Sequence, residues 1–134
     1  MPLSWKSQQF QKILENLFPP AVSGCVLTPD GAPLHLQYAH LADIGTLPLA
    51  GRITNQYLQL KPGQIAIMND PYSGGTLLST VTLVVGISMN PKSPLKTDLL
   101  LAYRFPLRPH LKFAATVDEE GLRIPPTPIA DSGV

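Results

Sequence analysis

The chain has 134 residues, of which 44% are hydrophobic and only 14% are charged, and its formal net charge is +1 at neutral pH. This length is typical of a single domain spanning 1–134, and the near-neutral charge excludes a nucleic-acid binder that works by neutralising a run of phosphates. An average domain has ~25% charged residues. The lower share of charged residues in this chain indicates a surface that binds a partner, and we expect a homo-oligomer.

Cysteine content and hydropathy indicate in which cellular compartment the protein is expected. The single cysteine, Cys25, excludes an internal disulfide and a cysteine-based zinc site. The longest nearly apolar run, 81–89, is much shorter than the ~20 residues that a membrane-spanning helix needs. Residues 1–6 lack the pattern of a signal peptide. We therefore expect a cytoplasmic protein that does not contact a membrane.

The first half of the chain predicts a helix, a hairpin and a second helix. Apolar residues at helical spacing predict a helix over 4–18, which two prolines end. A β-prone run over 22–28, the turn Pro29–Gly31 and an alternating run over 34–38 predict a hairpin. After a loop over 39–47, Pro48 is expected in the first turn of a second helix that runs to about Leu60.

The second half of the chain predicts mainly strands. The whole chain contains 15 prolines, which favour turns and short elements. Strands are expected over 64–68, over 76–89 with a bulge at Gly86, and over 97–105, which is apolar enough to be central. A further strand is expected within 106–117, and 118–134 is expected to be irregular. The predicted fold is therefore α+β, a mainly antiparallel sheet with two helices covering one face.

Few residues in the chain predict chemistry. His40 precedes Asp43 by three residues, and a histidine and a carboxylate can share a metal ion, but two ligands do not make a site and a hydrogen-bonding role in the loop is favoured. Asp70 is interpreted as a turn residue that caps backbone N–H groups, with the orienting of a nucleophile or a metal ligand as the alternative. Cys25, in the middle of a strand, is expected to be a buried and inert thiol.

Five segments, in this order, resemble motifs of the hydantoinase B/oxoprolinase family. The sharpest resemblance is to the motif N-D-P-Y-x-G-G-T of that family. The matching segments here are CVLTPDG at 25–31, AH at 39–40 with GTLP at 45–48, LKPGQI at 60–65, NDPYSGGT at 69–76 and EEGLRIPP at 119–126. Together they cover nearly all of this chain but resemble only the N-terminal part of the large subunits of that family. The resemblance implies an ATP-using, hydantoinase A-like partner subunit and the opening of cyclic amides such as hydantoins or 5-oxoproline.

The chain departs from the family at the positions that the resemblance would assign to a metal. Where the family has a histidine and then an aspartate after Gly-Gly-Thr, this chain has Leu77 and Thr80. The later His-His-x-Asp block of the family has no counterpart, because His110 stands alone in that region. Leucine has no lone pair to offer and threonine is a poor ligand. The resemblance therefore implies a degenerate, stand-alone domain with no metal and no other cofactor.

Three functions remain open from the sequence. The first is a non-catalytic binding or assembly module. The second is a small subunit or fragment of an ATP-dependent cyclic-amide hydrolase or related carboxylase, in which His40, Asp43 and Asp70 contribute to a shared site. The third is a small-ligand binder, for which the chain offers Trp5, Tyr38, Tyr57 and Tyr72 as aromatic walls.

Overall fold

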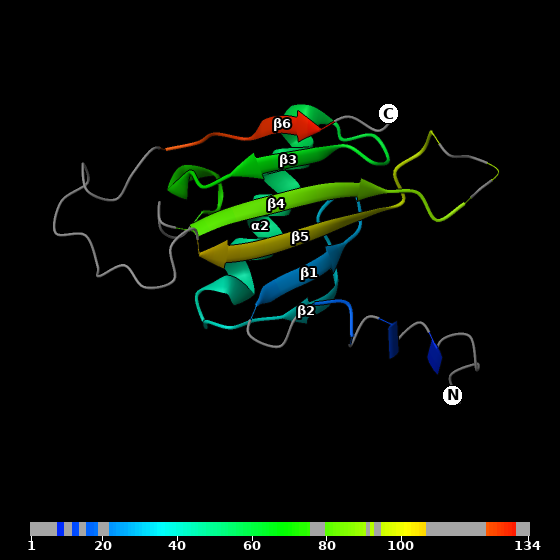
Figure 1. Cartoon of the computed structure of the whole chain (residues 1–134), viewed down its shortest axis with the longest axis horizontal. Coiled ribbons are helices and arrows are strands. Elements are labelled where there is room, and N and C mark those ends of the chain that lie inside the picture. The colour runs from blue at the N-terminus through cyan, green and yellow to red at the C-terminus, as the bar shows by residue number, and fades with distance from the viewer. Residues whose placement is uncertain are drawn as a thin grey trace, which may run out of the picture.

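The structure, a computed structural model, describes residues 8–9, 12–13, 16–18, 22–75, 80–90, 92, 95–106 and 123–130. In this part of the chain, strands form a single six-stranded sheet in the order β2-β1-β5-β4-β3-β6, and every neighbouring pair is antiparallel (Figure 1). The strands are β1 (Ser23–Leu27), β2 (Pro33–Gln37), β3 (Ile65–Met68), β4 (Thr80–Ile87), β5 (Leu99–Pro106) and β6 (Thr127–Ala130). Helix α2 (Asp43–Leu58) packs on one face of this sheet, which confirms the α+β class.

The predicted hairpin is confirmed. β1 and β2 pair through a turn in which the Gly31 N–H donates to the Thr28 carbonyl (2.9 Å), and the Thr28 N–H donates to the Ala32 carbonyl (2.9 Å). Gly31 has a φ of 95°, a conformation that glycine adopts without the cost a side chain would impose. The turn chemistry of the local sequence therefore determines this part of the fold.

The predicted central strand is also confirmed, because β5 lies between β1 and β4. The expected bulge at Gly86 is wrong, since the ladder between β4 and β5 continues through this residue without a register shift. A Cβ at Gly86 would lie 2.6 Å from the carbonyl oxygen of Lys61, and the Gly63 N–H donates to the Gly86 carbonyl (2.9 Å). Glycine is needed here for a close backbone approach and not for a kink.

Helix α2 begins earlier than predicted. It starts at Asp43 and contains Pro48, so the loop expected over 39–47 is wrong from residue 43 onward. Pro48 has no N–H to donate to the Ile44 carbonyl four residues before it, and the helix continues because its buried face packs against the sheet. It ends where Gln59 adopts a left-handed conformation with a φ of 48°.

The segment expected to be irregular contains a strand. Thr127–Ala130 forms β6, which pairs with β3 at the edge of the sheet. Proline is tolerated on an edge strand because its missing N–H can face away from the ladder, and this explains Pro128 within β6. Most of the helix predicted over 4–18 lies outside the described residues, and so do Leu77 and His110. The further strand expected within 106–117 also lies outside them, except for residue 106, which ends β5.

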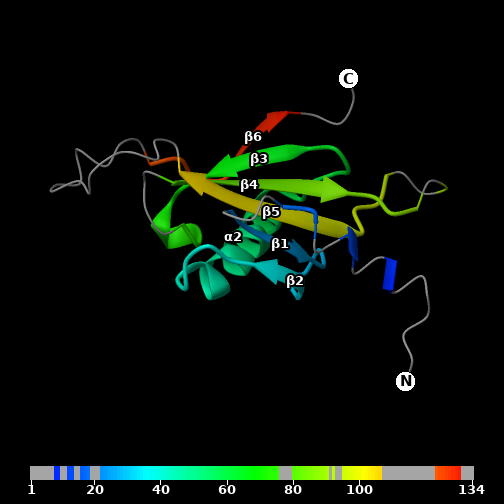
Figure 2. The ribbon, with the colours of Figure 1, turned by 60° about the horizontal axis from the view of Figure 1, so that its bottom comes forward.

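The two faces of the sheet differ in their covering. Figure 2 shows α2 on one side of the sheet, where the main buried cluster lies. This cluster comprises Cys25, Leu27, Leu47, Leu60, Ala66, Val84, Leu100 and Ala102. On the other face Phe18 packs on Val26, and its ring stacks on that of Tyr103 with centroids 6.1 Å apart. No helix among the described residues has the length and apolar character needed to cross a membrane.

Candidate functional site

A buried ion pair lies where the first turn of α2 meets the sheet. The Arg104 Nη1 atom, on β5, is 2.7 Å from the Asp43 Oδ1 atom, and both side chains are buried. The other carboxylate oxygen of Asp43 accepts a hydrogen bond from the Ser23 hydroxyl on β1 (2.5 Å). Burying two charges is costly unless they are paired and their remaining hydrogen-bonding groups are satisfied, and the surroundings of this pair meet that condition.

The remaining donors of Arg104 contact two further segments, and α2 a second time. Its Nε atom donates to the Thr82 hydroxyl on β4 (2.9 Å), and Nη1 also donates to the Thr46 hydroxyl on α2 (2.9 Å). Its Nη2 atom donates to the Gly74 carbonyl (2.6 Å), in the loop that follows β3. The guanidinium therefore joins two strands, the helix and this loop, and the carboxylate of Asp43 is directed to Arg104 and Ser23 and away from solvent.

The loop 69–75 has the contacts of a structural turn. The Asp70 carboxylate accepts hydrogen bonds from the Tyr72 N–H (3.1 Å) and the Ser73 hydroxyl (3.3 Å), at the start of the 3₁₀ turn η1 (Pro71–Ser73). This confirms the interpretation of Asp70 as a capping residue. Gly74 has a φ of 94°, and a Cβ there would lie 2.6 Å from the backbone nitrogen of Ala50 on α2. Gly74 therefore lets the loop pack directly against the backbone of the helix.

A second segment is attached to the same loop. The Asn69 side chain is buried and its Oδ1 atom accepts a hydrogen bond from the Ile124 N–H (2.5 Å). The Asn69 N–H donates to the Ile124 carbonyl (2.9 Å), and the Arg123 guanidinium lies 5.9 Å from the centre of the Tyr72 ring. The structure therefore places the segment 123–126 beside the loop 69–75, although the two are about 50 residues apart.

The three candidate residues from the sequence do not share one exposed site. Asp43 is buried with Arg104, and Asp70 caps the loop that Arg104 contacts at Gly74. The side chain of His40 is exposed, and its carbonyl accepts a hydrogen bond from the Asp43 N–H (3.0 Å). Thr80 lies at the start of β4, opposite Pro106. Within the described ranges, no three histidine, cysteine, aspartate or glutamate side chains gather where a metal ion could bind.

Sequence reasoning missed Arg104, which organises this cluster. The signal was present, since Arg104 is the single charged residue in the apolar strand β5. A charge in a central strand must be paired to be buried, and the partner lies 61 residues away in the chain. The segment alone could not identify that partner.

Cys25 lies close to the same cluster and is fully buried, as predicted. Burial raises the pKa of the Cys25 thiol from 9.0 to about 12, against an opposing effect of the positive charge on Arg104. The thiolate is the reactive form of cysteine. The thiol stays protonated at neutral pH, so this residue has the environment of a packing residue and not of a nucleophile.

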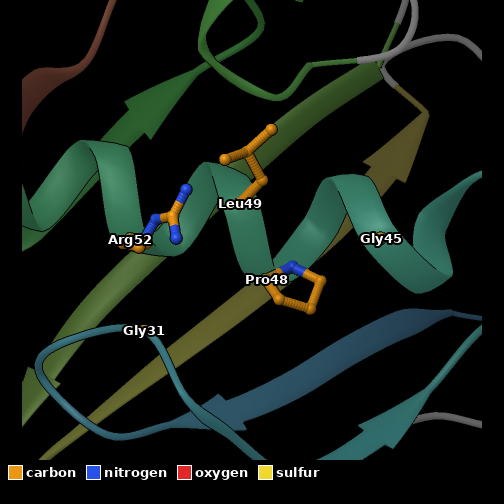
Figure 3. A pocket seen from close by; sticks show the side chains of 5 residues that line it. All are labelled: Gly31, Gly45, Pro48, Leu49 and Arg52. Atoms are coloured by element: carbon orange, nitrogen blue, oxygen red, sulfur yellow. The ribbon is translucent and has the colours of Figure 1, made fainter.

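A shallow pocket lies on the outer side of α2, next to the hairpin turn (Figure 3). Its volume is about 260 Å³, and it is lined by Gly31, Gly45, Pro48, Leu49 and Arg52. A Cβ built at Gly31 would lie 2.6 Å from the Cβ and Cγ atoms of Arg52, so the stem of Arg52 rests on the turn. The sequence analysis did not identify this pocket, because it depends on the packing of the hairpin against the helix.

Comparison with known proteins finds a likeness of fold. No protein-family model matches the sequence, and no curated protein sequence matches it. Among solved structures, the crystal structure of ATP-dependent caprolactamase from Pseudomonas jessenii is similar, with a TM-score of 0.62 and 16% sequence identity. The likeness covers 90% of this chain and 23% of that chain. The chain therefore spans less than a quarter of the length of the solved structure that it matches.

Proposed function

We propose that this chain is an assembly module on a hydantoinase B/oxoprolinase-like fold, which binds another polypeptide and has no catalytic centre of its own. The observation that carries this proposal is the engagement of Asp43. The carboxylate of Asp43, one of the two acidic candidates from the sequence, accepts hydrogen bonds from Arg104 and Ser23 inside the core. Such a group holds the fold together and is not available to a substrate or a metal ion.

Two further observations support the module. The fold is similar to less than a quarter of a much longer enzyme. Two of the sequence motifs that resemble the family contain turns that set backbone geometry. In the structure these turns are Pro29–Gly31 and the loop 69–75, and each is stabilised by its own hydrogen bonds. Chain geometry can persist after a site has lost its ligands, because turn chemistry and ligand chemistry depend on different residues.

The experiment combines mass, metal content and activity. Size-exclusion chromatography with light scattering of the purified chain is expected to give a homo-oligomer, and elemental analysis is expected to give less than one metal ion per chain. Incubation with ATP and hydantoin, 5-oxoproline or caprolactam is expected to give no ring opening. A clean monomer at high concentration that holds one divalent metal ion per chain would overturn the proposal.

A second candidate function is favoured by the likeness to the caprolactamase. In this alternative the chain is one part of an ATP-dependent cyclic-amide hydrolase or related carboxylase and contributes residues to a site shared with a hydantoinase A-like subunit. Exposed His40, which lies just before α2, is the residue that such a subunit could reach. Reconstituted ring-opening activity that is lost in His40→Ala and kept in His35→Ala, a matched change on β2, would establish this alternative.

A further inference from the structure

The face of the sheet that points away from α2 is apolar over its three central strands. In Figure 1 the sheet is seen from this side, with α2 behind it. Side chains alternate between the two faces along a strand, and Ala66, Val84 and Ala102 belong to the buried cluster on the helix side. The side chains that alternate with them form the open face, which comprises Ile65, Ile67, Leu83, Val85, Ile87, Leu99, Leu101, Tyr103 and Phe105.

The strand pairing brings the side chains of the open face together. Val85 on β4 is paired with Ile65 on β3 and with Leu101 on β5. Directly paired residues of antiparallel strands have neighbouring side chains on the same face, so the open face consists of continuous apolar rows across three strands. All of its side chains are partly exposed, whereas the residues between them, on the helix side, are buried.

The described cover of the open face is confined to one part of it. Phe18 packs with Val26 against the β5 side chains Leu99, Leu101 and Tyr103. No described helix or strand lies over β3 and β4 on this side (Figures 1 and 2). Val81, near the start of β4, points to the same side and is buried, so the uncovered part is centred on Val85.

Two properties of the open face favour a second copy of this chain as its occupant. None of the side chains that form it is charged, so a two-fold axis brings the face against itself without like-charge contacts. The sheet is also large enough, because a rise of ~3.4 Å per residue and a strand spacing of ~4.8 Å give the six described strands a face of about 550 Å². Two such faces bury about 1,100 Å², and a specific interface needs about 1,000 Å².

We propose that two copies of the chain pack through their open faces into a β-sandwich, with the α2 helix of each copy on the outside. Sheets that pack in this way lie ~10 Å apart, and their strand directions differ by about 30°. The resulting dimer has a helix, two sheets and a helix as successive layers, and the apolar side chains of both copies interdigitate at its centre. The proposal rests on the assembly role above and names the surface and the partner.

The first test uses the wild-type chain. Sedimentation equilibrium from micromolar to millimolar concentration measures the dissociation constant, and methyl spectra recorded over the same range locate the contact. We expect a monomer–dimer equilibrium in which the methyl signals of Ile65, Leu83 and Val85 shift as the dimer forms. The methyl signals of Ile44 and Leu47, which lie on α2, are expected to stay in place.

The second test compares two variants with the same change of side chain. Leu83→Glu is expected to weaken dimerisation at least about 100-fold, because it buries a charge and brings two like charges into one interface. Leu41→Glu places the same charge on an exposed leucine in the turn before α2, and is expected to leave the dissociation constant unchanged. Circular dichroism of each variant reports whether it has folded, and the wild-type methyl spectra decide the location if Leu83→Glu does not fold.

The outcomes separate this proposal from the proposed function. A chain that stays monomeric at millimolar concentration and holds no metal ion overturns self-association through the open face, and leaves a module that binds a different polypeptide. A dimer whose methyl shifts lie on α2, or that responds equally to Leu83→Glu and Leu41→Glu, overturns the open face and leaves the assembly role standing. A monomer that holds one divalent metal ion per chain overturns both proposals.

Discussion

Arg104 on β5 and Asp43 at the start of α2 form an ion pair inside the core, with 2.7 Å between Nη1 and Oδ1. The pair connects the helix to the sheet across 61 residues of sequence. The guanidinium also donates to the Thr46 hydroxyl on the same helix, and to Thr82 on β4 and the Gly74 carbonyl, which belong to two further segments. The position of α2 and the path of the loop 69–75 therefore depend on one side chain.

Replacing Arg104 tests this dependence. Arg104→Met leaves the Asp43 carboxylate buried without its charged partner, and we expect the free energy of unfolding to fall by about 3–5 kcal/mol. Urea denaturation followed by circular dichroism measures the change. The double variant Arg104→Met, Asp43→Leu removes both charges and is expected to recover part of the loss. A loss below about 1 kcal/mol in the single variant would show that the pair does not hold the fold together.

Much of the fold could be predicted because its signals are local. Alternating side chains and the turn Pro29–Gly31 identified the hairpin, and apolar runs identified β3, β4 and the central position of β5. The start of α2 was missed because it depends on Asp43 and its distant partner, while the sequence shows only a proline that usually begins a helix. β6 was missed because a proline-rich segment becomes a strand only when an edge such as β3 is available to it.

The candidate site was less predictable than the fold. Asp70 was interpreted correctly as a turn residue, because Asp-Pro followed by two glycines is a strong local signal. Asp43 was identified as a carboxylate of interest, but its partners Arg104 and Ser23 come from two different strands. Contacts of this kind follow from the strand order, which no local pattern determines.

The buried thiol of Cys25 predicts how stability depends on pH. Its pKa is raised from 9.0 in the unfolded chain to about 12 in the folded protein, so above pH 9 the unfolded state loses a proton that the folded state keeps. Stability from this group is complete below pH 9 and is lost as the pH rises toward 12, by about 1.4 kcal/mol per pH unit. We expect wild type to lose this stability relative to Cys25→Ala in denaturation at several pH values. Parallel curves for the two proteins would contradict the raised pKa.

Two glycines near α2 form a matched pair for mutagenesis. Gly74→Ala is expected to lower the free energy of unfolding by about 1–3 kcal/mol, because its φ is positive and the added methyl would meet the backbone of Ala50. Gly45→Ala is expected to raise it by up to about 1 kcal/mol, since alanine favours the helix and the methyl meets no atom within 4 Å. Thermal denaturation compares them, and shifts of the same sign would be inconsistent with this packing.

The hydroxyl of Thr54 is a local defect in the core. It is buried on α2, and its Oγ1 atom has no hydrogen-bond partner among the described residues. Thr54→Val keeps the shape and removes the unsatisfied group, so we expect it to stabilise the protein by about 1 kcal/mol. Thr54→Ser keeps the hydroxyl and loses the methyl, and is expected to destabilise. If the urea midpoints of the two variants shift in the same direction relative to wild type, this interpretation is contradicted.

The place of β5 beside β1 has a consequence for biosynthesis. The hairpin leaves the ribosome before its long-range neighbour β5, which also carries Arg104 and is made some 70 residues later. Non-local pairings of this kind slow folding, because the entropy of closing the intervening loop is lost before the contact forms. Until β5 emerges, the nascent polypeptide holds an uncovered strand edge and a carboxylate without its cation, which makes this interval the one in which a chaperone would matter most.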